Sequence, residues 1–160
     1  MLIRITKGER DDVVAILRGD GSKAVTRFPK KGPVPHDAVH YFVERGWPLP
    51  RGFWGSVAAG VHPEEIAAIA KAAGHASASR ARVPDASIVE IVQAERLVEC
   101  FEADYWDGGG ADDTLIAVAE AACAASFVPC PRRERASSQR SARPSANSPA
   151  NGDRRRLAIS

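Results

Sequence analysis

The sequence predicts a single α+β domain. An N-terminal three-stranded antiparallel β-meander packs against a helical remainder of about four helices, and a disordered C-terminal tail follows. Three observations predict this: extended patterns over the first 28 residues, helical spacing of apolar residues from about residue 36, and the absence of aromatic residues from Pro131 onward. Sequential strands followed by sequential helices argue against alternating βαβ units. We therefore expect one domain over residues 1–130 and a tail over residues 131–160.

Two extended segments and a turn predict the meander. Residues 2–6 alternate apolar and polar side chains, with Ile3 and Ile5 on one face. Residues 13–17 form a run rich in β-branched side chains that suits a more central strand. Residues 19–22 (Gly-Asp-Gly-Ser) tolerate the positive φ of a tight hairpin, after which residues 24–28 resume the extended pattern.

The helices are marked by proline, acidic first turns and glycine. Pro35 suits the first turn of a helix that ends near Gly46, because its missing N–H is not needed there. Similar signals predict one or two helical turns within residues 52–60 and longer helices over residues 62–74, 84–104 and 112–127.

The net charge of +2 is unevenly distributed. Residues 131–160 hold eight Arg and two acidic residues, giving +6, whereas the preceding residues hold 14 basic and 18 acidic ones, giving −4. The tail has no aromatic residue and too little apolar surface to offset its ordering entropy, so we expect disorder. Nucleic acid or an acidic partner could bind only through the tail, because the acidic body offers no basic face; the alternative is a tail that only aids solubility.

Hydropathy and cysteine usage predict a cytoplasmic protein without a membrane segment. No apolar run approaches the ~20 residues that span a bilayer, and the N-terminal residues lack the apolar block of a signal peptide. The three cysteines include no CxxC pair, which disfavours both a disulfide framework and a cysteine zinc site. Cys100 and Cys123 are expected to be buried thiols.

The segment His36-Asp37-x-x-His40 is the candidate metal site. Two His at i and i+4 project from one helix face, so both imidazoles can reach one divalent ion such as zinc. Glu44, one turn further, either completes the ligand set or holds an imidazole from the second shell. The pattern resembles the His-Glu-x-x-His motif of zinc metallopeptidases, and that resemblance implies Asp37 as the general base.

A third ligand is not evident from the sequence. His62 and His75 are available, but neither lies in the usual continuation of the metallopeptidase motif. A purely structural interpretation also explains the segment: Asp37 offsets the helix dipole, and His40 is half-buried and hydrogen-bonded to Glu44.

Two other features are candidate binding sites. Lys30 and Lys31, in a Pro/Gly loop before a helix, are a candidate anion-binding pair that would share His36. Three aromatic residues after the first helix either close that helix onto the sheet or form a partner surface: Trp47, Phe53 and Trp54.

Residues 28–44 resemble a family of small uncharacterised bacterial proteins that carry Phe-Pro-Lys-Lys-Gly-Pro-x-Pro-His-Asp-x-x-His. The resemblance extends over residues 51–55 and excludes the Arg-rich tail; it implies no activity. Because no complete catalytic set is visible in the sequence, we expect a non-catalytic interaction or regulatory module. It would use residues 30–44 and the nearby aromatic residues to bind an unknown protein partner or to self-associate. The alternative is a metal-dependent hydrolase-like enzyme that uses His36 and His40 on one helix face.

Overall fold

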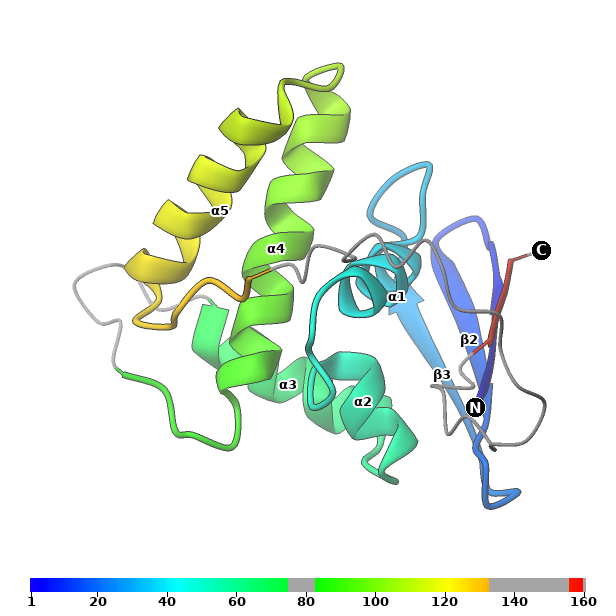
Figure 1. The fold of residues 1–160 in the computed structure, drawn as a ribbon. Helices are drawn as coiled ribbons and strands as arrows, with labels where there is room; N and C mark the ends of the chain where they lie inside the picture. Colours follow the sequence, from blue (N-terminus) through cyan, green and yellow to red (C-terminus); the bar gives the residue numbers. More distant parts are fainter. Residues whose placement is uncertain (75–82, 133–155, 160) are drawn as a thin grey trace, which may run out of the picture.

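A computed structural model describes residues 1–74, 83–132 and 156–159. It shows the predicted α+β fold, in which the helices gather on one side of a small sheet (Figure 1). Strands β1 (Leu2–Thr6), β2 (Asp11–Leu17) and β3 (Lys23–Pro29) pair as antiparallel neighbours, which confirms the meander. The strand order is β3-β2-β1-β4, in which β4 is Arg156–Ile159.

The register of β1 and β2 places their apolar side chains on the helix-covered face. Ile3 lies opposite Ile16 and Ile5 lies opposite Val14, and all four side chains are buried. Because successive strand residues point to opposite faces, the alternation in β1 selects this register. Each such buried side chain contributes about 1.5–3 kcal/mol relative to exposure.

The fourth strand differs from the predicted disordered tail. Residues Arg156–Ile159 form β4, which runs parallel to β1 with Ile3 opposite Leu157. The open edge of β1 supplies backbone partners, as in the hydrogen bond from Arg156 N to Met1 O at 2.8 Å. Backbone hydrogen bonding of this kind does not require a particular side-chain pattern, so the sequence did not indicate a strand over residues 156–159. The rest of the tail predicted to be disordered, residues 133–155 and 160, lies outside the described residues.

Five helices follow the meander in the described chain: α1 (His36–Gly46), α2 (Phe53–Ala58), α3 (Pro63–Gly74), α4 (Val89–Trp106) and α5 (Asp112–Ala125). Most lie within a few residues of their predicted ranges. Helix α4 instead begins at Val89 rather than at Pro84. The Asp85 carboxylate accepts hydrogen bonds from Ser87 N and Oγ at 2.8 and 2.7 Å, which favours a turn over a helix start.

The core has a part under the sheet and a part between the helices. Under the sheet, the strand residues pack on Phe53, Trp54 and Ile66. Between α1, α4 and α5, the largest buried side chains are Leu49 and Leu97. None of the described helices is long and apolar enough to cross a membrane. Cys100 and Cys123 are buried free thiols, as predicted.

Candidate metal centre

Helix α1 presents both histidines to α4, against which it packs. His36 and His40 are one helical turn apart, and their ring centroids lie 4.9 Å apart with the planes at 77°. His40 is 2% exposed, whereas the His36 side chain keeps 15% exposure. The two imidazoles therefore occupy the α1–α4 interface rather than the outer surface of α1.

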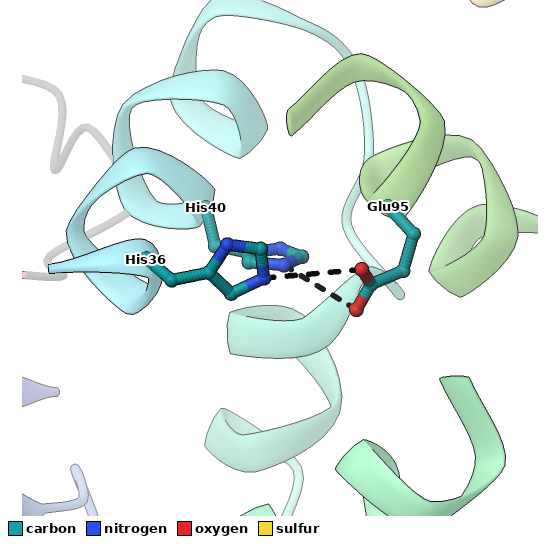
Figure 2. Close-up of side chains that lie close together, drawn as sticks. All are labelled: His36, His40 and Glu95. Atoms are coloured by element: carbon teal, nitrogen blue, oxygen red, sulfur yellow. Dashed lines mark ion pairs between the residues drawn. The ribbon is translucent and has the colours of Figure 1, made fainter. Parts of the chain in front are cut away.

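Glu95 of α4 brings a carboxylate to both rings (Figure 2). Its Oε1 lies 3.4 Å from His40 Nε2, and its Oε2 lies 3.9 Å from His36 Nε2. One donor atom from each of these three residues lies within 4.8 Å of the other two, so the cluster could hold a metal ion.

The other nitrogen of each imidazole faces a different carboxylate. His36 Nδ1 donates to Glu102 Oε1 at 2.8 Å, since an ionised carboxylate can only accept. His40 Nδ1 lies 3.5 Å from Glu44 Oε1, an electrostatic contact that does not meet hydrogen-bond geometry. Metal-binding histidines commonly have a carboxylate at the second nitrogen, which directs the first nitrogen to the ion. The arrangement around His36 and His40 follows this pattern.

Glu44 is held away from the three-residue cluster. Its Oε2 accepts hydrogen bonds from the backbone N–H of Trp54 at 2.9 Å and of Gly55 at 3.4 Å. A Cβ built on Gly52 would lie 2.8 Å from Glu44 Cδ, so the backbone approaches this carboxylate closely. Glu44 and Glu95 thus face opposite nitrogens of the His40 ring. Glu95, rather than Glu44, therefore belongs with His36 and His40 to the cluster that could hold a metal ion.

The charges of the cluster are strongly coupled. Burial alone would lower the pKa of His40, but the Glu44 and Glu95 carboxylates outweigh it and raise the pKa to about 10. Burial would raise the pKa of Glu95, but His40 and then His36 outweigh it and lower the pKa to about 2. In the metal-free protein at neutral pH, His40 is therefore an imidazolium between two carboxylates.

Asp37, the predicted general base, is buried at the start of α1. Burial raises the pKa of its carboxyl, against the opposing charges of His40, His36 and Lys31. Its backbone oxygen accepts a hydrogen bond from Trp54 Nε1 at 2.9 Å, which fixes the first turn of the helix. The catalytic role of Asp37 remains a prediction.

The lysine pair lies beside the cluster. Lys30 Nζ donates to Gly8 O at 3.3 Å. Lys31 lies close enough to affect the carboxyl groups of the cluster. Burial would raise the pKa of the Glu102 carboxyl, but the hydrogen bond and charge of His36 outweigh it and lower this pKa, and the charge of Lys31 lowers it further. Lys31 thus acts on carboxylates of the protein itself, and an external anion at this pair remains a prediction.

The predicted partner surface is wrong for two of its three aromatic residues. Phe53 and Trp54 are 4% and 0% exposed, because they fill the space between α1 and the sheet. Trp47 is half-buried against Phe101, with ring centroids 5.3 Å apart. The alternative interpretation of Phe53 and Trp54 as core is confirmed.

Sequence reasoning missed the acidic face of α4. Glu95, Glu99 and Glu102 stand at i, i+4 and i+7, so they share one face of the helix. This spacing was a detectable signal, because acidic residues in a helix that is otherwise largely apolar need cationic or metal partners when buried. Pairing that face with α1 required the tertiary structure. Of the two other candidate third ligands, His62 is exposed at the start of α3, and His75 lies outside the described residues.

Comparisons with known proteins add nothing to this geometry. A scan against protein-family models, a search of curated proteins and a search of solved structures each gave no match.

Proposed function

We propose that this protein is a non-catalytic, metal-binding regulatory module. A divalent ion, with zinc as the first candidate, binds to His36 Nε2, His40 Nε2 and the Glu95 carboxylate. The observation that carries the proposal is the orientation of the two rings. Each imidazole turns Nε2 toward the shared Glu95 carboxylate and faces a second carboxylate with Nδ1. Two imidazoles and one carboxylate form a donor set suited to zinc or iron(II).

The distances between donor atoms support this assignment. Ligands held about 2.0–2.2 Å from a tetrahedral ion lie roughly 3.3–3.6 Å from one another. Glu95 Oε1 lies 3.4 Å from His40 Nε2, within that range, and Glu95 Oε2 lies 3.9 Å from His36 Nε2, just above it. One donor atom from each of the three residues lies within 4.8 Å of the other two, so the side chains would have to move closer together to bind an ion.

The ion would join two helices that are distant in the sequence. His36 and His40 belong to α1 and Glu95 belongs to α4, so a bound ion adds a link across their interface. A proton on His40 occupies the same nitrogen in the metal-free protein, so metal and proton compete. Metal binding must release that proton, and the apparent metal affinity rises with pH.

A regulatory role fits the burial of the ligands. The His40 side chain is 2% exposed, and the Glu95 side chain is 19% exposed. A cavity of about 670 Å³ lies beside the cluster and is lined by Lys31 and Glu102 rather than by the three proposed ligands, among the described residues. A substrate in this cavity would contact residues around the site more readily than the ion itself.

A hydrolase-like enzyme is the second candidate function, favoured by one observation. Three protein ligands leave a tetrahedral coordination position for water or substrate, as in catalytic zinc sites. Asp37, with a pKa raised by burial, would be the base. If this candidate holds, zinc-dependent hydrolysis of peptide or ester substrates is lost in Asp37→Asn while zinc binding remains. Regulation without catalysis predicts no such turnover in either protein.

The direct experiment compares zinc binding by the full-length wild type, His40→Ala and His62→Ala. His62 is an exposed histidine outside the cluster, which makes it the matched control. We expect one zinc per chain in the wild type and His62→Ala, and loss of zinc in His40→Ala. At zinc concentrations 100-fold above the Kd, binding raises Tm by roughly 5–10 °C. Equal zinc binding by wild type and His40→Ala would refute the proposal.

A further inference from the structure

A second feature, distant from the metal centre, is an apolar groove along α4 and α5. Helix α5 lies at the end of the molecule away from the sheet, and its main contacts are with α4 (Figure 1). The groove has a cavity volume of about 1160 Å³. Its lining includes large apolar side chains from both helices and from the segment after α5: Leu97, Phe101, Leu115, Ile116 and Val128.

Helix α5 leaves large apolar side chains exposed, and one of them, Ile116, lines the groove. Ile116 and Val118 are each 50% exposed, although the helix carries few charged residues after its first turn. Its buried residues, Ala119 and Cys123, have small side chains. A surface of this kind, rimmed by charged residues, is typical of a protein interface.

Phe127, just after α5, is an independent sign of an interface. It has φ 57°, in the left-handed region that favours glycine, and its side chain is 52% exposed. Val128 N donates to Cys123 O at 3.1 Å and Phe127 N donates to Ala124 O at 3.0 Å, the hydrogen bonds of a Schellman cap. Glycine would form this cap without the steric strain of a side chain at positive φ. Because about half of the Phe127 side chain is exposed, its burial within the monomer offsets little of this strain. A contact between the ring and another molecule would account for it.

The groove is lined by side chains of both charges: Asp112, Glu120 and Arg132. Asp112 begins α5, Arg132 follows its C-terminal end, and both side chains line the groove. If a second α5 lies antiparallel along the groove, its Asp112 approaches Arg132 of the first chain, and its Arg132 approaches Asp112. This pairing is self-complementary about a two-fold axis, as a symmetric dimer requires.

We propose that the groove binds a second copy of this chain, so that two α5 helices pack antiparallel and form a homodimer. Ile116 and Phe127 of each protomer supply apolar contacts, while Asp112 and Arg132 set the direction. A 14-residue helix is roughly 21 Å long, so the interface is small and a micromolar Kd is expected. This proposal is independent of metal binding.

Sedimentation equilibrium of the full-length protein from about 1 to 500 µM tests the proposal, with Phe127→Gly and Phe42→Ala as a matched pair. Phe42 is 64% exposed on α1, away from the groove. We expect a concentration-dependent dimer for wild type and Phe42→Ala. Phe127→Gly should weaken the dimer at least 10-fold while the monomer stays folded, because glycine relieves the positive φ. Circular dichroism checks that fold.

The direction of packing is tested by a charge exchange. Asp112→Lys and Arg132→Glu should each weaken the dimer about 10-fold, and the double variant should return to within about 3-fold of wild type. Wild type that stays monomeric at every concentration overturns the proposal and leaves the chain's own residues 133–155 as the candidate cover of the groove. A dimer unaffected by Phe127→Gly, Asp112→Lys and Arg132→Glu overturns it too, because the interface then lies elsewhere.

Discussion

Helix α4 has two faces of opposite character. Toward α1 it presents Glu95 and Glu102, whose carboxylates contact the histidines within a largely closed interface. Toward α5 it presents Leu97 and Phe101, which line an open apolar groove. One face thus encloses charge, and the other leaves apolar surface accessible.

The two faces of α4 therefore require different kinds of partner. Carboxylates in a closed interface are stable only with compensating positive charge, which a proton on His40 or a metal ion supplies. Accessible apolar side chains gain free energy when a protein surface covers them. The predictions below separate these two kinds of stabilisation, from the largest expected effect to the smallest.

The largest loss of stability is expected on substitution of Glu44, which contacts His40 but is not one of the proposed metal ligands. Glu44→Ala removes the acceptor of the Trp54 and Gly55 N–H groups and one partner of the buried His40. We expect a loss of about 3–5 kcal/mol in the free energy of unfolding. Urea denaturation with EDTA present measures it, and Glu44→Gln should recover part of the loss. A metal-free stability equal to wild type would contradict the structural role of Glu44.

The two faces themselves are compared by Leu97→Ala and Glu95→Ala. Leu97 is 1% exposed, so its truncation should cost about 2–5 kcal/mol of stability and leave the zinc Kd within about 3-fold of wild type. Glu95→Ala should abolish the gain in Tm that zinc gives. Titration calorimetry and thermal unfolding with and without zinc give both quantities. If Leu97→Ala weakened zinc binding as much as Glu95→Ala, the two faces would not be separable.

Substitution of Glu102, whose carboxylate contacts His36 but is not a proposed ligand, should have a smaller effect on zinc binding. Glu102→Gln weakens the hydrogen bond that orients His36, and we expect zinc affinity to fall 10–100-fold. Glu99→Gln is the matched control, because Glu99 lies on the same helix face and pairs with Arg96 at 3.0 Å. Its zinc affinity should stay within about 3-fold of wild type. Equal losses in both variants would indicate a general charge effect instead of orientation.

The smallest expected effect, per pH unit, is a change with pH in the stability of the metal-free protein. The pKa of His40 is raised from 6.5 to about 10 on folding, so its contribution is complete below pH 6.5 and is lost as pH rises through 10. The pKa of Glu95 is lowered from 4.5 to about 2, so its contribution is complete above pH 4.5 and is lost as pH falls through 2. The stability advantage of wild type over His40→Ala should peak between these limits and decline by at most about 1.4 kcal/mol per pH unit. Denaturation curves that show no such decline above pH 6.5 would contradict the ion-pair network.

Local patterns predicted most of the fold. The alternation of Ile3 and Ile5 and the turn residues 19–22 carry enough information for the meander, and Pro35 marks the start of α1. Strand β4 could not be predicted, because its pairing depends on a free edge of β1 and not on its own composition.

The candidate site was predictable only in part. The spacing of His36 and His40 on one helix identified two donors, since i and i+4 share a face. Glu95 could not be assigned to the same site, because its position depends on how α4 packs against α1. Glu44 appeared equivalent from spacing alone, but backbone N–H groups of α2 hold its carboxylate. Phe53 and Trp54 show the same limitation, because aromatic content does not distinguish core from surface.

X-ray absorption at the zinc edge of the zinc-loaded, full-length protein tests the central claim most directly. We predict a first shell of two imidazole nitrogens and carboxylate oxygen at about 2.0–2.2 Å, with loss of one imidazole in His36→Ala. A first shell that contains sulfur at about 2.3 Å would place the ion on the cysteines and contradict the His36–His40–Glu95 centre.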